Sequence, residues 1–357
     1  MDAKKTKAMA ERAFRDMAGG MAAGMAFIGH QCGLFEAMSG RGPVNAAELA
    51  ESTGLVERYV EEWLRGMVAA EYLEYDPAAK TFELSEEHAY LLASNGTDHF
   101  MGGLFAMLPP LMEVVPSVCD AFRDGGGVAF SDYSSQCREA IDLMNRGNYE
   151  HRLVDYWLQQ IPDTLERLST GANVLDIGCG SGHVVAAIAR AFPDANVLGI
   201  DPDKQSIARA QSLVDSAELG NARFISALLA DLPADERFDL IMLCDCLHDL
   251  PDPVPVLRDA SARLTEGGVL FVIEPRAADQ LEDNIHPVAT MLYGFSVMHC
   301  MTQSLASGGL GLGACLGPER TMALLGEGGF EDVRQLRIRS PVNLFYVASA
   351  PADPAQS

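Results

Sequence analysis

The stretch Asn173-Val-Leu-Asp-Ile-Gly-Cys-Gly-Ser-Gly182 decides the fold of this chain. Its apolar half predicts a buried strand that ends in Asp176, and a helix is expected directly afterwards, over residues 183–190. The three glycines between them let the backbone approach a ligand closely and turn sharply into a helix N-terminus. The stretch therefore predicts the ligand-binding strand, loop and helix of an α/β sheet.

A second apolar run, Asn196-Val-Leu-Gly-Ile-Asp201, ends in another carboxylate. At that position a carboxylate can accept hydrogen bonds from both hydroxyls of a ribose. The loop is not the dinucleotide fingerprint G-x-G-x-x-G, because His183 stands where the third glycine would be. The acid that leads the loop, Asp176, also suits a ligand with an ammonium group better than a pyrophosphate. A nicotinamide or other nucleotide-binding fold remains the alternative.

Strand, loop, helix and second acid together resemble the class I S-adenosylmethionine-dependent methyltransferases, over roughly residues 170 to 350. The resemblance implies an α/β, Rossmann-like fold with a seven-stranded sheet and S-adenosyl-L-methionine as the cofactor. The last two strands should form an antiparallel pair. The expected strands are 173–177, 196–201, 222–227, 238–245, 269–274, 333–338 and 343–349.

The resemblance also assigns positions around the cofactor. The acid and the glycines of the loop should lie along its methionine and ribose portions, Asp201 should bind the ribose, and Pro202 should lie against the adenine. One position departs from the family, because Leu228 stands where an acid is often found. Adenine recognition would then use backbone groups of Leu228 and Leu229. The expected cofactor-binding residues are Asp176, Gly178, Gly180, Gly182, Asp201, Pro202, Leu228, Leu229 and Asp245.

The composition restricts the partners. The chain has 357 residues, 48% of them hydrophobic, and a formal net charge of -24. Such a charge opposes binding to a nucleic acid backbone or an anionic membrane, so we expect neither as a partner. The eight cysteines include no C-x-x-C pair and no metal-ligand spacing. This pattern favours reduced thiols, a cytoplasmic location and no bound metal.

Apolar residues recur at helical spacing near the N-terminus, which predicts a face that is buried or lies in a dimer interface. They are Phe14, Met17, Met21, Met25 and Ile28.

Residues 11–95 resemble a winged-helix module, with short helices over 46–54 and 56–68 and a hairpin over 72–84. A helix-turn-helix invites a DNA-binding hypothesis. However, residues 41–95 hold eleven acids and only four bases, so repulsion from phosphates should dominate. The module resembles the N-terminal dimerisation domain of small-molecule O-methyltransferases, which implies a homodimer.

These features divide the chain into successive parts. We expect a winged-helix dimerisation domain over 1–95, a helical connector over 96–170 and a cofactor-binding methyltransferase domain over 171–350. Within the last part, residues 280–316 should form a helical cap over the substrate. Residues 351–357 are expected to be a tail.

The segment after the fourth strand, Leu247-His248-Asp249, resembles the His-Asp-Trp segment of plant-type O-methyltransferases, with Leu250 in place of the tryptophan. In that family the histidine is the general base, which implies catalytic roles for His248 and Asp249. The alternative is that His248 caps the next helix or packs against the cofactor.

The connector and the cap supply candidates for binding a substrate. Tyrosines there could close over the cofactor's sulfonium, and arginines could anchor a substrate carboxylate. Core packing of the tyrosines and solvation of the arginines are the alternatives. The candidates are Tyr133, Arg138, Arg146, Tyr149, Tyr293 and His299.

The predicted function is methyl transfer to an oxygen or a sulfur atom of a small metabolite. The layout is also similar to bacterial methylthiohydroxybutyrate S-methyltransferases of the dimethylsulfoniopropionate pathway. A hydroxyl acceptor must lose a proton and needs a base, whereas a thioether needs only positioning and desolvation. A winged-helix regulator with the methyltransferase fold as a sensor is the non-enzymatic alternative.

Overall fold

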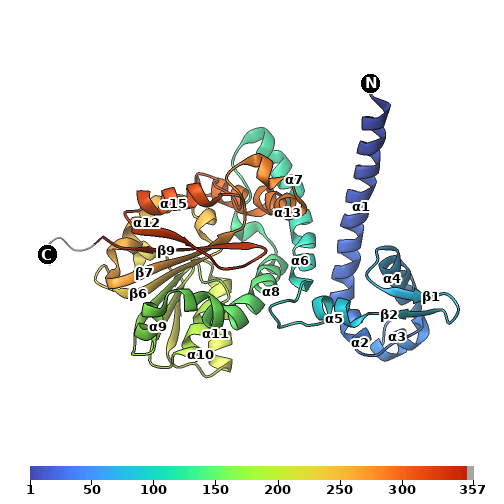
Figure 1. The fold of residues 1–357 in the computed structure, drawn as a ribbon, viewed down its shortest axis with the longest axis horizontal. Helices are drawn as coiled ribbons and strands as arrows, with labels where there is room; N and C mark the ends of the chain where they lie inside the picture. Colours follow the sequence, from blue (N-terminus) through green and yellow to red (C-terminus); the bar gives the residue numbers. More distant parts are fainter. Residues whose placement is uncertain (352–357) are drawn as a thin grey trace. The chain divides into compact units, whose positions relative to one another are not determined.

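The structure is a computed structural model that describes residues 1–351, and it forms two compact units (Figure 1). The first unit holds Met1–Met112 and Glu139–Asn148, and the second holds Glu113–Arg138 and the chain from Tyr149 onward. The residues predicted as a connector, 96–170, are mostly helical and are shared between the two units. Of the predicted tail, residues 352–357 lie outside the described residues.

The first unit contains the predicted winged helix. Asn45 begins α3 by accepting a hydrogen bond from the Glu48 backbone, while the Glu48 side chain accepts one from the Asn45 backbone. Gly54, at φ 70°, ends the helix as predicted. The elements are α1 (Ala3–Gln31), α2 (Leu34–Met38), α3 (Ala46–Thr53), α4 (Glu57–Ala69), β1 (Glu74–Asp76), β2 (Thr81–Glu83), α5 (Glu86–Leu92) and α6 (Gly102–Ala106).

The apolar stripe of α1 is exposed in the single chain. Residues 1–21 are all exposed, and the side chains of Phe14 and Ile28 are 79% and 49% exposed. The C-terminal half of the helix is held by Trp63, whose indole N–H donates to the Met25 carbonyl at 2.8 Å. Of the two expectations for the stripe, burial within the chain is therefore wrong for its exposed members.

A seven-stranded sheet forms the centre of the second unit, in the order β5-β4-β3-β6-β7-β9-β8. The first five of these strands run parallel, whereas β9 runs antiparallel to both β7 and β8, as predicted. The strands are β3 (Asn173–Ile177), β4 (Asn196–Ile200), β5 (Ala222–Ile225), β6 (Phe238–Cys244), β7 (Leu264–Pro275), β8 (Glu331–Leu336) and β9 (Asn343–Ser349).

Helices cover both faces of this sheet (Figure 1). One face carries α9 (Pro162–Leu168), α10 (His183–Ala191) and α11 (Lys204–Ser216), and the other carries α12 (Pro253–Ala262) and α15 (Pro318–Glu327). Alternate residues of β3 therefore enter different cores: Val174 packs into one apolar cluster and Leu175 into the other.

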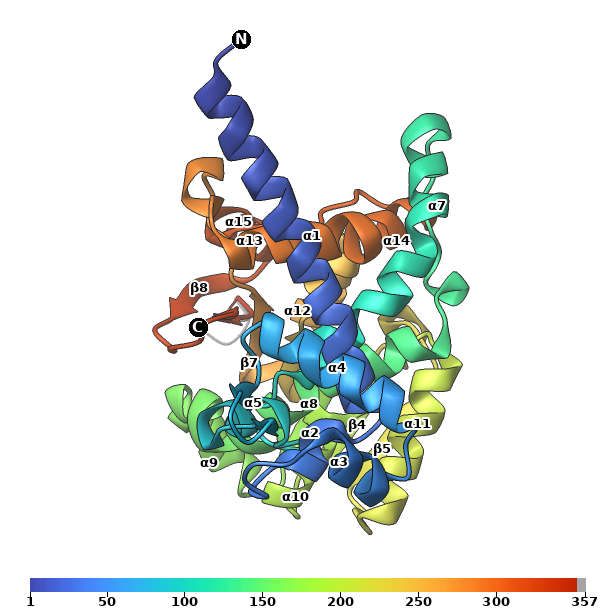
Figure 2. The same ribbon diagram turned by 90° about the vertical axis from the view of Figure 1, so that its right-hand side faces the viewer.

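The predicted cap is helical and lies on the same side of the unit as α15 (Figure 2). Its third element is a single π-helical turn, a form that is common at functional sites. The cap elements are η6 (Leu281–Asn284), α13 (Pro287–Phe295), η7 (Ser296–Cys300) and α14 (Met301–Ala306).

The remaining elements are short turns of helix and two longer helices. One helical stretch, Gly102–Asp124, is long and apolar enough to cross a membrane, but 39% of that window is buried within the structure. The elements are α7 (Leu108–Asp124), η1 (Phe130–Asp132), α8 (Ser135–Arg152), η2 (Leu153–Trp157), η3 (Leu158–Gln160), η4 (Leu229–Asp231) and η5 (Leu247–Asp249).

Candidate active site

The glycine loop joins β3 to α10 and requires glycine at three positions. Gly178, Gly180 and Gly182 have φ angles of 70°, 51° and 83°, which side-chain-bearing residues rarely adopt. A Cβ atom on Gly182 would also lie 2.6 Å from the Phe224 ring. The loop can therefore pass close to the sheet.

Asp176 is the most deeply buried acid of the loop, with 1% of its surface exposed. Neither of its carboxylate oxygens has a hydrogen-bond donor among the described residues. Burial and the nearby Asp201 raise the pKa of Asp176 well above its ordinary value. Because an unpaired buried acceptor is costly, this position fits a ligand that brings N–H donors, such as an ammonium group.

Asp201 lies at the carboxyl end of the neighbouring strand β4, and backbone groups orient it. Its Oδ2 accepts from the Gly180 N–H at 3.0 Å, and its Oδ1 accepts from the Asp203 N–H at 2.8 Å. Burial raises the pKa of Asp201, and these two hydrogen bonds oppose the rise. Pro202 follows and is exposed. Their roles at the ribose and the adenine stay predictions.

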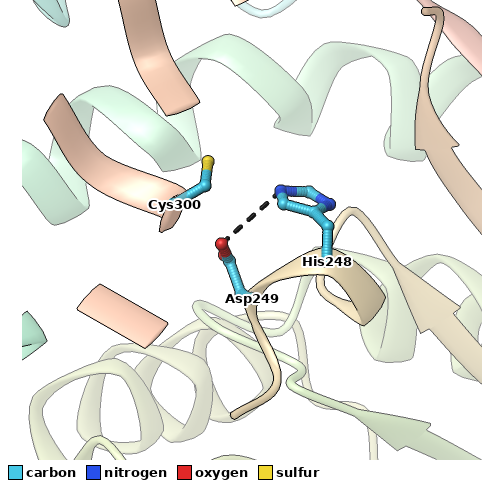
Figure 3. Close-up of side chains that lie close together, drawn as sticks. All are labelled: His248, Asp249 and Cys300. Carbon is cyan, nitrogen blue, oxygen red and sulfur yellow. Dashed lines mark ion pairs between the residues drawn. The ribbon is translucent and has the colours of Figure 1, made fainter. Parts of the chain in front are cut away.

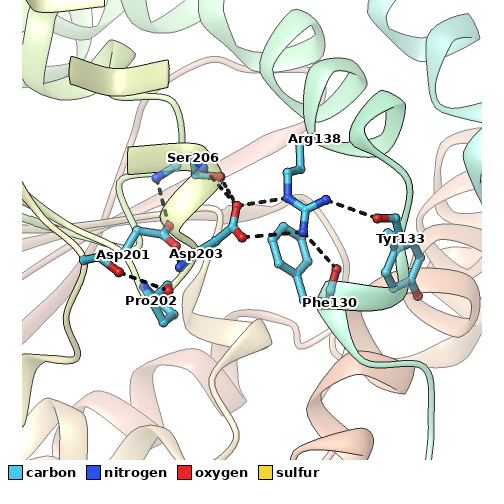
Figure 4. Close-up of polar contacts among 9 residues, drawn as sticks. Phe130, Tyr133, Arg138, Asp201, Pro202, Asp203 and Ser206 are labelled. Carbon is cyan, nitrogen blue, oxygen red and sulfur yellow. Dashed lines mark hydrogen bonds and ion pairs between the residues drawn. The ribbon is translucent and has the colours of Figure 1, made fainter. Parts of the chain in front are cut away.

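Arg138 lies beside these acids and is 5% exposed (Figure 4). Its Nε donates to Asp203 Oδ2 at 2.9 Å, and its terminal nitrogens donate to the carbonyls of Tyr133 at 3.1 Å and Phe130 at 3.3 Å. A substrate carboxylate would have to displace Asp203. The predicted role of Arg138 as a substrate anchor therefore does not fit this geometry.

The adenine prediction for Leu228 is wrong in its backbone part. The Leu228 N–H donates to Asp231 Oδ2 at 2.9 Å, and the Leu228 carbonyl accepts from the Asp231 N–H at 3.0 Å. Both backbone groups are thus used by the turn that Asp231 closes. The exposed Leu228 side chain is still available for an apolar contact, whereas Leu229 is buried.

Asp245 follows β6 with a φ angle of 53°, a left-handed conformation that aspartate and asparagine adopt more readily than most residues. Its Oδ2 accepts from the Tyr149 hydroxyl at 2.8 Å, and its Oδ1 accepts from the Asn343 amide at 3.0 Å. Burial raises its pKa to about 6, and the Tyr149 hydrogen bond opposes the rise. Tyr149 and Asp245 therefore bind each other. From the sequence, Tyr149 was assigned to the substrate and Asp245 to the cofactor.

His248 is 3% exposed and lies between the carboxylates of Glu274 and Asp249, the second of which Figure 3 shows beside the ring. Its Nδ1 is 2.9 Å from Glu274 Oε2, and its Nε2 is 3.5 Å from Asp249 Oδ1. Burial alone would lower the pKa of His248, but Glu274 and Asp249 outweigh it and raise the pKa well above its ordinary value. The predicted base is thus held by a carboxylate on one ring nitrogen, as general bases commonly are.

The sequence-based prediction missed Glu274, which lies on β7 and is 1% exposed. The available signal was a single acid at the end of the apolar run 269–273, where only a paired charge is tolerated.

The cap brings Cys300 to the same place, so that the ligating atoms of His248, Asp249 and Cys300 lie within 4.8 Å of one another. No spacing in the sequence predicts this cluster. Next to it, the His299 ring packs at 4.9 Å from the Tyr133 ring, and the Tyr133 hydroxyl donates to the Met298 carbonyl at 2.6 Å. The structure therefore brings Tyr133 and His299 into contact, and their role in binding a substrate stays a prediction.

Two other candidates for substrate binding lie outside this cluster. Tyr293 lies on α13 and is 39% exposed. Arg146 belongs to the first unit, where it donates to Asn95 at 2.6 Å and pairs with Asp142 at 3.9 Å. Their roles in substrate binding stay predictions.

Comparison with known protein families gives a match for each of the two parts of the chain. A family model for a "Methyltransferase domain" matches residues 168–325, and one for an "Rv2258c-like winged HTH domain" matches residues 19–94. The chain joins a methyltransferase domain to a winged-helix domain.

Curated relatives match just under a third of the chain. The ubiquinone biosynthesis O-methyltransferase of Xanthomonas campestris is 32% identical over 103 residues, which are 29% of this chain and 42% of that protein. The trans-aconitate 2-methyltransferase of Deinococcus radiodurans is 36% identical over 108 residues, or 30% of this chain and 40% of that protein. The chain thus matches under half the length of these relatives.

Solved structures share the fold over nearly the whole chain. Human N-acetylserotonin methyltransferase, in complex with SAM, has a TM-score of 0.67 at 20% identity, with 96% of this chain and 99% of that chain covered. An O-methyltransferase family protein from Burkholderia thailandensis has a TM-score of 0.65 at 17% identity, with 98% of each chain covered. This likeness shows that the two-part architecture recurs in other proteins.

Proposed function

We propose that this protein transfers a methyl group from S-adenosyl-L-methionine to an oxygen atom of a small metabolite. The observation that carries the proposal is the pair of acids at the ends of β3 and β4. Asp176 is buried with two unpaired oxygens, and Asp201 is oriented by backbone N–H groups beside the glycine loop. An ammonium group and a ribose diol are the donors that such a pair suits.

The cofactor supplies an electrophilic methyl group on a sulfonium. On the protein's side, Asp176 would bind the amino group, Asp201 the ribose, and the exposed Pro202 and Leu228 would flank the adenine. The left-handed glycines would let the backbone lie against the ligand. The structure of the human relative in complex with SAM supports this assignment of the cofactor.

His248 is the group that we expect to handle the acceptor's proton. A hydroxyl acceptor must be deprotonated, and His248 is held by Glu274 with its other ring nitrogen toward Asp249. Its raised pKa favours the imidazolium, and His248 must lose that proton before it can act as a base. The names of the relatives, which include O-methyltransferases, favour oxygen over the thioether alternative.

The cofactor assignment is tested by isothermal titration calorimetry with S-adenosylhomocysteine, followed by an activity screen with methyl-labelled cofactor. The screen should contain phenols, hydroxy acids and methylthio acids. We expect binding of one cofactor per chain and label transfer to a hydroxyl compound. Absence of cofactor binding would overturn the proposed function, and transfer to a methylthio acid would replace oxygen by sulfur.

For the winged helix we propose dimerisation rather than DNA binding. The two arginines of α4 are already paired on their own helix, Arg58 with Glu62 and Arg65 with Glu61, both at 2.5 Å. The exposed stripe of α1 offers an apolar face that a second copy of the chain would cover. We expect this homodimer in the cytoplasm, in keeping with eight free cysteines.

The dimer is tested by replacing Phe14 and Met17 with serine. We expect the wild type to be a dimer in multi-angle light scattering. The dimer dissociation constant of the double variant should be about 10- to 100-fold higher, because interface aromatics dominate binding energy. Replacing Lys7 and Glu11, a solvent-exposed pair on the same helix, is the matched control. A double variant as dimeric as the wild type would place the interface elsewhere.

A further inference from the structure

We propose that Arg138 is a positioning residue that transmits occupancy of the ribose site to the surroundings of the proposed base, His248. The inference rests on the proposed function, because the ribose site is the one that Asp201 forms. We call residues 128–138 the strap, and Arg138 is its last residue.

The first link joins the ribose site to Arg138. The Asp203 N–H donates to Asp201 Oδ1 at 2.8 Å, and the Asp203 side chain accepts from Arg138 Nε at 2.9 Å. Both partners of this ion pair are shielded, with 5% and 15% of their side chains exposed, so solvent screens the pair weakly. A ligand that fixes the Asp201 carboxylate therefore also fixes the backbone that presents Asp203 to Arg138.

The second link joins Arg138 to the rest of the strap (Figure 4). The guanidinium donates to the carbonyls of Tyr133 and Phe130, and its carbon lies 4.7 Å from the centre of the Phe130 ring. A planar group with several donors can serve Asp203 and two carbonyls at once, which a lysine ammonium cannot do with the same geometry. Arg138 thus sets the backbone of the strap as well as neutralising Asp203.

The third link joins the strap to the cap. Phe130 and Tyr133 contact the His299 ring edge-to-face, at 5.9 and 4.9 Å. The Val128 N–H donates to the Thr302 hydroxyl at 3.0 Å, and the Tyr133 hydroxyl donates to the Met298 carbonyl. The strap is therefore attached to η7 and α14 through Val128 and Tyr133 and to Asp203 through Arg138.

The chain of contacts ends beside the proposed base. His299 precedes Cys300, whose sulfur lies in one cluster with His248 and Asp249. If cofactor binding fixes Asp201, the ordering should pass through Asp203, Arg138 and the strap to η7, before any acceptor is bound. Arg138 would act through these residues and touch neither reactant.

The test is hydrogen–deuterium exchange of the full-length protein with saturating S-adenosylhomocysteine. Exchange in residues 176–182 reports binding, and exchange in residues 296–302 reports the coupling. We expect the wild type to gain protection in both segments. In Arg138→Met, the affinity for S-adenosylhomocysteine should fall about 3- to 30-fold, the size of effect found for other coupling residues. At saturating ligand, residues 176–182 should be fully protected, whereas residues 296–302 should not.

Two further variants sharpen the outcome. Arg138→Lys keeps the charge and should restore the affinity in part, but not the full protection of residues 296–302. Arg167→Met is the matched control, because Arg167 pairs with Asp239 at 3.0 Å at the opposite, amino-terminal edge of β3 and β6, and it should behave as the wild type.

Equal protection of residues 296–302 in the wild type and Arg138→Met, or no protection of this segment in the wild type, would overturn the inference. If Arg138→Met does not fold, Arg138→Lys is judged by the same criterion. Failure of the proposed function would look different: the wild type would neither bind S-adenosylhomocysteine nor gain protection in residues 176–182.

Discussion

Backbone groups build most of the cofactor side of the site, whereas side chains build its acceptor side. On the cofactor side, left-handed glycines shape the loop, and the N–H groups of Gly180 and Asp203 orient Asp201. On the acceptor side, His248 and Glu274 come from different elements and meet as buried, charged side chains. A side chain can be deleted by substitution, but a backbone N–H cannot.

This difference separates the effects that substitutions should have. Changes on the acceptor side should alter turnover and its pH dependence while cofactor affinity is kept. Changes on the cofactor side should alter affinity or the stability of the loop. A variant that changes both properties strongly would show that the two sides are not independent, which is the behaviour that we propose for Arg138 alone.

The largest effect is expected for His248. His248→Gln keeps a polar group beside Glu274 but cannot accept the acceptor's proton, so turnover should fall roughly 10²- to 10⁴-fold. The affinity for S-adenosylhomocysteine should stay unchanged in calorimetry. His88→Gln, in the winged helix, is the matched control. A thioether acceptor predicts the opposite result, a loss below about tenfold, because no proton leaves.

The pH profile of the same reaction provides an independent check. Because the carboxylates raise the pKa of His248, the wild-type rate should rise with pH through a value above the ordinary 6.5. Glu274→Gln removes the main attraction for the imidazolium, so the midpoint of the profile should move to lower pH. A midpoint that does not move in Glu274→Gln would assign the titration to another group.

A smaller effect, on stability, is expected for the glycine loop. Gly182→Ala places a methyl group 2.6 Å from Phe224 at a φ angle of 83°. Backbone strain and overpacking together should lower the free energy of unfolding by about 2–5 kcal/mol, measured by urea denaturation. Gly220→Ala is the control, since a methyl group there meets no atom within 4 Å and the backbone is unstrained. Equal stability of the two variants would mean that the loop can rearrange.

The same contrast explains how much the sequence could predict. The cofactor side is encoded locally: Asp176, the glycines and Asp201 fall within one strand, loop, helix and strand, and all seven predicted strands are present. Continuous apolar runs and the spacing of the glycines are properties of neighbouring residues, so a linear pattern is enough to find them.

The acceptor side depends on contacts between distant residues. Glu274 reaches His248 across 26 positions, and Arg138 reaches Asp203 across 65. From the sequence, Arg138 was treated as available for a substrate carboxylate, because its partner in the chain, Asp203, lies two strands and several helices further along. No local pattern specifies such pairs. Leu228 was misassigned for a different reason, since Asp231, only three positions along the chain, bonds to its backbone N–H and carbonyl.

An intermediate effect on cofactor affinity is expected for Asp201. Asp201→Ala removes a charged acceptor for the ribose hydroxyls and should weaken S-adenosylhomocysteine binding by about 1–3 kcal/mol. Calorimetry measures this directly, with Asp235→Ala, an exposed acid of the same domain, as the control. An affinity equal to that of the wild type would remove Asp201 from the site. Turnover at saturating cofactor should change little, which keeps the two sides distinct.

The smallest effect is expected for Asp245, which lies between the two sides and is held by side chains. Its folded-state pKa of about 6 exceeds the ordinary value of 3.8, so the folded protein binds its proton more tightly than the unfolded chain does. For such an acid, the free energy of unfolding should rise as the pH falls from 7 to 5, by about 1 kcal/mol. Asp245→Asn cannot titrate, and asparagine tolerates the φ angle of 53°.

The wild type should therefore gain about 1 kcal/mol relative to Asp245→Asn between pH 7 and pH 5, in parallel urea titrations. Asp235→Asn provides the control, because that exposed side chain should leave the difference independent of pH. A constant difference between wild type and Asp245→Asn would mean that hydrogen bonds from Tyr149 and Asn343 keep this carboxylate ionised. Asp245 would then resemble Asp201, an ionised acid oriented by hydrogen bonds, and it would belong to the cofactor side of the proposed site.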